Sequence, residues 1–214
     1  MKRLGIERID LYYQHRIDPK VEPETVAETM RTLMQEGKIR AWGISEANEE
    51  YLRRAHAVCP VTAVQNRYSM MARWHESLFP VLEELDVAFV AFSPMANGLL
   101  TGAYNKETKF NEVGDYRSDM PQFTEAGMRQ SQALRALLDR IAAEKDATPG
   151  QISLSWMLCK KPYIIPIPGS RKSERLKEKL GAAGIRLSAE EIAAIDATLS
   201  TMEFDVFGGH RGKA

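Results

Sequence analysis

The sequence predicts an α/β fold in which parallel strands alternate with helices. Short runs rich in β-branched and aromatic residues recur along the chain, and longer segments with apolar residues at helical spacing separate them. Because these helices are long enough to serve as crossovers, we expect a parallel sheet buried by helices. Alternation alone leaves open whether the sheet is open or closed into a barrel. The strands are expected at residues 9–15, 39–45, 62–69, 88–94 and 164–170.

The helical segments carry amphipathic patterns and capping signals. Residues 23–38 place Val26, Met30 and Leu33 at helical spacing. Thr148 before Pro149 is a typical N-cap followed by proline at the first helical position. Ser188, with Glu191 three residues later, is typical of a capping box. Further helices are expected over residues 75–86, 130–145, 148–161 and 189–199, and another from about residue 173.

The composition excludes several classes of protein. The 214 residues include 29 basic and 29 acidic side chains, so a nucleic-acid or anionic-membrane partner is not expected. Two scattered cysteines, Cys59 and Cys159, are too few for a disulfide framework or a zinc site. No apolar run reaches the roughly 18 residues of a membrane span, and the polar start has no signal-peptide pattern. We therefore expect a cytoplasmic protein without a metal.

Polar or aromatic side chains stand at the end of every predicted strand. Chemistry in parallel α/β proteins collects at the carboxyl ends of strands. Each residue alone has a structural explanation: a histidine can bind a loop carbonyl, a serine can cap the next helix, and a phenylalanine can belong to the core. Five consecutive strand ends of this kind predict a polar ligand lying across them. The residues are His15, Ser45 with Glu46, Gln65 with Asn66, Phe92 with Ser93, and Ser170 with Arg171.

Residues 166–180 have the chemistry of an anion site. Gly169 allows close backbone approach, and Ser170 can donate a hydrogen bond at the start of a helix. Arg171 and Arg175 bring positive charge to the same helix end, where cations are unfavourable unless an anion lies between them and the helix dipole. The alternative is a solvated basic helix face. Neither GxGxxG nor GxxxxGK[ST] occurs in the sequence.

Two further segments stand apart from the alternating pattern. Residues 103–123 are polar and follow the fourth strand, and a loop of that length in a compact domain is a lid, a binding loop or disordered. The glycine-rich, basic end of the chain suggests a C-terminal tail over residues 201–214.

Five ordered motifs, IDLYYQH, GISEAN, AVQNRYS, FSPMANGLLTG and IPGSRKSERLKEKLGA, resemble the aldo-keto reductase family over about residues 1–200. The resemblance implies a (β/α)8 TIM barrel that is incomplete here, with strands equivalent to the fourth to eighth present and the first three absent. It also implies one partial barrel domain over residues 1–200. The family binds NADPH across the carboxyl ends of its strands without a Rossmann motif.

The resemblance assigns roles to individual residues. His15 matches the histidine of the catalytic tetrad, Ser45 and Gln65 match the groups that bind the nicotinamide carboxamide, and Phe92 matches the residue that stacks on the nicotinamide ring. The pyrophosphate-side loop matches Ser93, Pro94, Met95, Gly98 and Leu99. The 2′-phosphate site matches Gly169, Ser170, Arg171 and Arg175. Glu178 matches an adenine contact, whereas Lys179 stands where relatives usually have asparagine.

The implied activity is NADPH-dependent reduction of an aldehyde or ketone by hydride transfer. The tetrad's Asp, Tyr and Lys motifs do not occur in the sequence, and residues 1–5 are typical of the last turn of a helix ending at Gly5. We therefore expect a truncated chain with exposed strand edges that favour self-association. Two alternatives stay open: an inactive chain that binds NADP, and a structural fragment with no ligand.

Overall fold

The computed structural model describes residues 3–105, 107–110 and 114–206, which form two compact units. The first unit comprises Met1–Arg67 and His75–Ala91, and the second comprises Tyr68–Trp74 and Phe92–Ala214. Five parallel strands alternate with helices along the chain, so the predicted α/β class is confirmed. Residues 207–214 of the predicted tail and residues 1–2 of the predicted first turn lie outside the described residues.

The first unit is a parallel sheet whose strands are ordered β1-β2-β3-β4. The register pairs Tyr13 with Gly43 across the first two strands and Ser45 with Gln65 across the next two. The elements are β1 (Ile9–Gln14), α1 (Pro23–Gln35), β2 (Ile39–Ser45), α2 (Glu49–Val58), β3 (Ala63–Arg67), the 3₁₀ turn Glu76–Leu78, α3 (Phe79–Leu85) and β4 (Ala88–Phe92), whose last residue belongs to the second unit.

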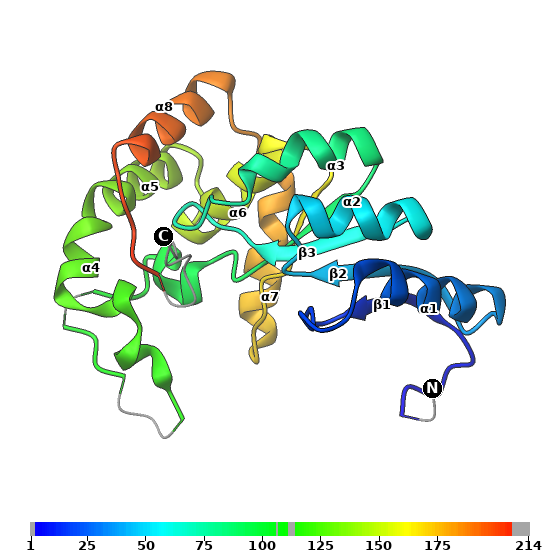
Figure 1. The fold of residues 1–214 in the computed structure, drawn as a ribbon. Helices are drawn as coiled ribbons and strands as arrows, with labels where there is room; N and C mark the ends of the chain where they lie inside the picture. Colours follow the sequence, from blue (N-terminus) through cyan, green and yellow to red (C-terminus); the bar gives the residue numbers. More distant parts are fainter. Residues whose placement is uncertain (1–2, 106, 111–113, 207–214) are drawn as a thin grey trace. The chain divides into compact units, whose positions relative to one another are not determined.

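Helices α1 and α2 pack side by side on one face of this sheet (Figure 1). Trp42 and Ile44 of β2 are fully buried, together with Leu52 and Ala55 of α2. Helix α2 was not predicted from the apolar pattern of the sequence. Its start is defined by Asn48, whose side-chain oxygen accepts a hydrogen bond from the Tyr51 backbone amide (2.9 Å). The opposite sheet face is therefore the one that carries the strand-end side chains described below.

The second unit is mainly helical. Its core includes Trp156, whose ring stacks on Tyr68 (5.6 Å between centroids) and whose indole nitrogen donates to Asp196 (2.9 Å). The capping boxes predicted at Thr148 and Ser188 are both present. The elements are α4 (Glu125–Gln130), α5 (Gln132–Glu144), α6 (Pro149–Lys160), β5 (Ile164–Pro166), α7 (Ser173–Leu180) and α8 (Ala189–Ser200), with 3₁₀ turns at Ala96–Thr101, Tyr116–Asp119, Pro121–Phe123 and Gly181–Gly184.

The first predicted strand ends one residue early, at Gln14, and three others are shorter for local reasons. The predicted run 88–94 ends at Phe92, because Ser93 has a positive φ of 53° and Pro94 follows it. The run 164–170 ends at Pro166, since Pro168 cannot donate to a ladder. The run 62–69 ends at Arg67, after which the chain turns back and Ser69 forms an isolated bridge with Ala72.

The segment 103–123 contains local structure rather than a featureless loop. The rings of Tyr104, Phe110 and Phe123 pack edge to face at 4.8–5.7 Å between centroids. The Arg117 guanidinium lies 5.0 Å and 4.6 Å from the Tyr104 and Phe110 ring centroids and forms an ion pair with Asp115. An aromatic cluster therefore organises this segment, of which residues 106 and 111–113 lie outside the described ranges.

Candidate functional site

Three predicted site residues of the first unit lie in one row at the carboxyl ends of adjacent strands. Ser45 of β2 pairs directly with Gln65 of β3. Gln14 of β1 pairs with Ile44, so His15 follows at the level of Ser45. Because side chains two apart on a strand share a face, this row lies on the side of the sheet opposite Trp42 and Ile44. The register therefore brings His15, Ser45 and Gln65 together.

The Ser45 hydroxyl links the ends of three strands. It donates to the Gln65 backbone carbonyl (3.1 Å) and accepts from the Arg16 guanidinium (3.0 Å), and Ser45 is only 2% exposed. The same Arg16 nitrogen donates to the His15 carbonyl (2.6 Å). Arg16 was not among the predicted site residues, although its position directly after His15 was available in the sequence. It ties the end of β1 to the buried hydroxyl of β2.

Directly below this row lies a second row made of Tyr13, Gly43 and Ala63. The Tyr13 ring lies against Gly43, where an added Cβ would be 2.4 Å from the Tyr13 Cε1 atom. Burial raises the pKa of Tyr13 above its usual 10.0, and the Gln65 side chain opposes that shift. Tyr13 was not predicted, because nothing in the strand pattern indicates how far its ring reaches.

The residues beside this row have structural partners. Asn66 is fully buried, and its side-chain nitrogen donates to the Ala47 carbonyl (2.9 Å) and lies 3.2 Å from Nδ1 of His75. Glu46 has a positive φ of 60°, and its backbone amide donates to the Gln65 carbonyl (3.1 Å). Both residues were noted at strand ends, and both hold the backbone that carries Ser45 and Gln65.

In the second unit, the loop after β4 has a strained backbone. Phe92 is half-buried, and Ser93, Ala96, Asn97 and Gly98 all have positive φ (53°, 45°, 59° and 102°). Such a conformation costs energy for any residue except glycine, and it concentrates at functional segments. Pro94, Met95 and Leu99 are buried and anchor the loop. The predicted pyrophosphate-side loop is thus a compact turn with its conformation defined by packing.

The loop between β5 and α7 presents unpaired positive charge. Within the described residues, neither Arg171 nor Arg175 forms an ion pair and both are exposed, although the charge of Arg171 contributes to the lowered pKa of Asp115. The Cβ direction of Gly169 meets open space. The Ser170 hydroxyl accepts from the Lys172 backbone amide (3.1 Å), which leaves its proton free to donate. Gly169, Ser170, Arg171 and Arg175 therefore lie together on this loop and the first turn of α7. Their hydrogen-bond donors are available to an anion.

Glu178 and Lys179 have partners within the second unit. The Glu178 carboxylate accepts from the Thr148 hydroxyl (2.9 Å), and its backbone carbonyl accepts from the Gln151 side chain (2.7 Å). The Lys179 ammonium donates to the Gly169 carbonyl (2.7 Å). Burial lowers the pKa of Lys179, and the like charge of Arg175 lowers it further. Lys179 thus stabilises the loop that contains Gly169 through this hydrogen bond.

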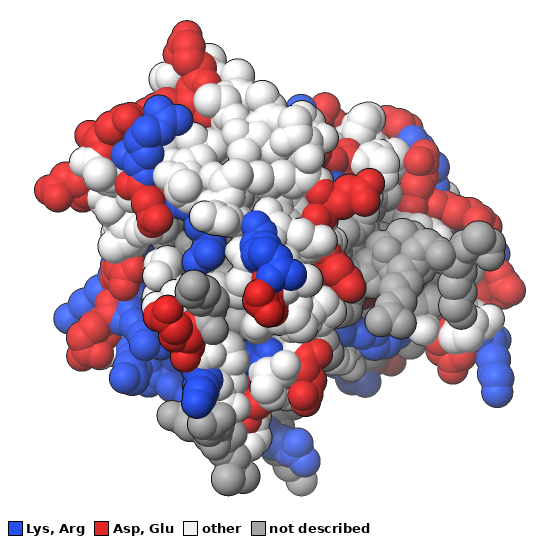
Figure 2. Space-filling model, turned by 90° about the vertical axis from the view of Figure 1, so that its left-hand side faces the viewer, with Lys and Arg blue, Asp and Glu red and all other residues white. Residues whose placement is uncertain are grey.

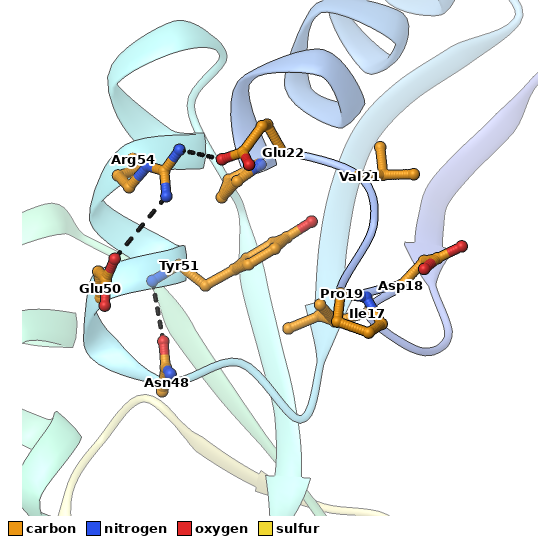
Figure 3. A pocket seen from close by; sticks show the side chains of 10 residues that line it. Ile17, Asp18, Pro19, Val21, Glu22, Asn48, Glu50, Tyr51 and Arg54 are labelled. Atoms are coloured by element: carbon orange, nitrogen blue, oxygen red, sulfur yellow. Dashed lines mark hydrogen bonds and ion pairs between the residues drawn. The ribbon is translucent and has the colours of Figure 1, made fainter.

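A separate cavity of about 240 Å³ lies in the first unit beside the β1–α1 loop (Figure 3). The Tyr51 ring crosses it, and the Tyr51 hydroxyl is hydrogen-bonded to the Gln14 side chain (3.0 Å). Arg54 pairs with Glu22 (2.5 Å) and Glu24 (2.7 Å) at its rim, so its charges largely satisfy one another. Sequence reasoning missed this cavity, because its walls come from two loops and a helix.

The described ranges contain neither a metal site nor a membrane-spanning helix. No group of three His, Cys, Asp or Glu side chains there could hold a metal ion. No helix within those ranges is long and apolar enough to cross a membrane. On the face shown in Figure 2, acidic and basic side chains are interspersed, in keeping with the equal totals of 29 each.

Comparison with known proteins gives the same family throughout. The model of the aldo/keto reductase family matches residues 1–200. Aldo-keto reductase str7 of Strobilurus tenacellus is 42% identical over 199 residues, which are 91% of this chain and 59% of that protein. Aldo-keto reductase yakc [NADP(+)] of Schizosaccharomyces pombe is 36% identical over 91% of this chain and 58% of its own length. The chain thus spans less than two thirds of these relatives.

Solved structures match the arrangement of the strands and helices. Glycerol dehydrogenase AKR11B4 from Gluconobacter oxydans superposes with a TM-score of 0.86 at 27% identity, over 94% of this chain and 61% of that one. The thermostable aldo-keto reductase Tm1743 gives a TM-score of 0.71 at 27% identity, over 92% and 62%. The five strands and their helices therefore match part of a TIM barrel, and the chain belongs to the aldo/keto reductase family.

Proposed function

We propose that this chain supplies the cofactor-binding strand ends of an NADPH-dependent reductase of aldehydes or ketones. The observation that carries the proposal is the row formed by His15, Ser45 and Gln65 on one face of the sheet. Three adjacent parallel strands there end in hydrogen-bonding groups at one level, as a planar polar ligand requires. Membership of the family and the NADP(+) in the name of the S. pombe relative support the choice of cofactor.

We propose that residues of the second unit bind the phosphate end of such a cofactor. Arg171 and Arg175 have no ion-pair partner within the described ranges, so their guanidinium groups are available for a phosphate. The free Ser170 proton and the open backbone at Gly169 add neutral donors and space. Phe92 and the loop Ser93–Leu99 are proposed to contact the nicotinamide ring and the pyrophosphate.

The proposed chemistry assigns positioning and hydrogen bonding to this chain. NADPH, when bound, would supply the hydride. The Ser45 hydroxyl and the Gln65 amide would orient the nicotinamide carboxamide, since Ser45 is already fixed by Arg16 and by the Gln65 carbonyl. The exposed His15 imidazole, held directly after β1, would donate a hydrogen bond to the substrate carbonyl.

A second candidate is a chain that binds NADP without turnover. The feature that favours it is that the Asp, Tyr and Lys motifs of the family tetrad do not occur in the 214 residues. In the family a tyrosine donates the proton that accompanies hydride transfer, and the motif that carries it is not found in these residues. The two candidates share one cofactor site and differ only in turnover, so binding and catalysis must be measured separately.

The test is a titration of the purified chain with NADPH and with NADH, followed by nicotinamide fluorescence. We expect saturable binding with preference for NADPH, and we expect Arg175→Ala to weaken NADPH binding by about tenfold or more, because it removes a charge-assisted bond to the 2′-phosphate. NADH binding should not change in that variant. The matched control is Arg140→Ala, an exposed arginine of α5 that pairs with Glu144.

The outcomes separate the candidates. No saturable binding by the wild-type chain would contradict both, and equal loss of NADPH and NADH binding in Arg175→Ala would contradict the 2′-phosphate assignment. Oxidation of NADPH in the presence of a panel of aldehydes and ketones would favour the reductase. Binding with no turnover on the panel would favour the NADP-binding chain.

A further inference from the structure

Tyr13 occupies the level directly beneath the candidate nicotinamide-binding row. Its register partner on β2 is Gly43, and the next residue across the sheet is Ala63. A Cβ on Gly43 would lie 2.4 Å from the Tyr13 ring and 2.7 Å from the Ala63 carbonyl oxygen. Real Cβ atoms do not approach that closely, so the two small residues leave the space that the aromatic ring fills. Tyr13 is therefore packed across the sheet toward β3.

The Tyr13 hydroxyl is buried and makes no hydrogen bond of good geometry with the described residues, although the Gln65 side chain lies close enough to lower the Tyr13 pKa by hydrogen bonding. A buried polar group without a partner destabilises the fold, and phenylalanine would fill the same space without that cost. Packing alone thus does not explain the hydroxyl. Buried groups of this kind call for a specific explanation, such as a partner that engages on ligand binding.

Gln65 is the polar side chain next to this hydroxyl. It stands two residues after Ala63 on β3, on the same face as Tyr13, and it acts on the ionisation of the Tyr13 phenol. Ser45 donates to the backbone carbonyl of Gln65 and therefore does not fix the orientation of the Gln65 side-chain amide. A side-chain amide presents either its oxygen or its nitrogen to a ligand, depending on how it is rotated.

We propose that Tyr13 is a positioning residue whose buried hydroxyl bonds the Gln65 side-chain amide and holds it in the orientation that binds the nicotinamide carboxamide. The proposal rests on the proposed function, because it assumes that Gln65 contacts the cofactor. Binding of the cofactor to Gln65 would bring this bond to good geometry. Tyr13 itself touches neither cofactor nor substrate.

The experiment compares Tyr13→Phe with wild type in the full chain. The matched control is Tyr12→Phe, which also loses one hydroxyl but points to the opposite face and is 41% exposed. Two probes are titrated: NADP(H), and 2′,5′-ADP, which has the 2′-phosphate end but no nicotinamide. We expect Tyr13→Phe to bind NADP(H) about fivefold more weakly, as for one lost hydrogen bond. Binding of 2′,5′-ADP should stay at the wild-type value.

Thermal unfolding shows whether the Tyr13 hydroxyl positions Gln65 or only contributes to the stability of the fold. Removal of an unpaired buried hydroxyl should leave the melting temperature unchanged or raise it. A lower melting temperature with equal losses for both probes would mean a structural role and would overturn the proposal. Unchanged NADP(H) binding by Tyr13→Phe, measured beside a wild-type chain that binds, would also overturn the proposal. Failure of wild type to bind either probe would instead contradict the proposed function itself.

Discussion

His56 lies in the last turn of α2, where its Nδ1 atom accepts a hydrogen bond from the Val61 backbone amide (3.2 Å). Burial lowers the pKa of His56 from 6.5, so the folded protein favours the neutral ring. The unfolded chain then binds the proton more tightly than the folded chain as the pH falls through 6.5 toward the lower folded pKa. Stability from this residue is therefore present above pH 6.5 and is lost on acidification.

We expect His56→Asn to reduce that acid-induced loss. Asparagine keeps a side-chain acceptor for the Val61 amide but cannot gain a proton in this range. The measurement is the free energy of urea unfolding of both proteins between pH 5 and 8. The two curves should lie close together at neutral pH and separate as the pH falls, with wild type losing more stability than the variant. Parallel curves would show that His56 does not titrate on unfolding.

At the scale of elements, Thr148 both caps α6 and joins it to α7. Its hydroxyl accepts from the Gln151 backbone amide (3.2 Å) and donates to the Glu178 carboxylate (2.9 Å). Ser188 forms an equivalent capping box on α8, but its second partner, Glu190, belongs to the same helix. Loss of the Thr148 hydroxyl therefore removes a contact between two helices as well as a cap.

We expect Thr148→Ala to lower the unfolding free energy by about 1–2 kcal/mol and Ser188→Ala by about 1 kcal/mol or less. Thr148→Ser, which keeps the hydroxyl, should stay close to wild type. Chemical denaturation of the three variants measures the differences. An equal effect of both alanine variants would mean that the Glu178 link adds nothing to stability.

The extent of the elements could be predicted where local signals decide them. The capping boxes at Thr148 and Ser188 define helix starts within one residue. Helix α1 ends at Gln35 instead of residue 38, because Gly37 adopts a positive φ of 72°. The aromatic cluster of Tyr104, Phe110 and Phe123 could not be predicted, since its contacts join residues that follow no helical or strand period.

The residues of the candidate site were likewise only partly predictable from the sequence. Because His15, Ser45 and Gln65 end successive strands, the rule for parallel sheets predicts that they are neighbours, and the register pairs Ser45 with Gln65 and Gln14 with Ile44. Arg16 and Tyr13 contribute through the reach of their side chains, and for Tyr13 that reach depends on whether the residue opposite is small. Gly43 beside Tyr13 decides that point, and it becomes visible only once the pairing of β1 with β2 is known.

At the scale of the whole molecule, β1 is the first strand of the sheet order and pairs with β2. Its Leu11 and Tyr12 are 37% and 41% exposed. An exposed strand with apolar side chains is a template for pairing with another chain unless charge protects it. Asp10, paired with Arg40 (3.3 Å), is the charged residue within β1, and it lies at the amino-terminal end of the strand.

We therefore expect the chain to self-associate through β1 at micromolar concentration and Leu11→Lys to shift it toward the monomer, because a charge at the centre of an edge strand opposes pairing. Sedimentation velocity over a hundredfold range of concentration measures the distribution. The control is Leu180→Lys, which changes a side chain that is more exposed (74%) but lies on α7. If Leu180→Lys alone restores the monomer, association runs through α7. If wild type is monomeric throughout, the edge of β1 does not pair, and its exposed apolar residues carry no tendency to associate.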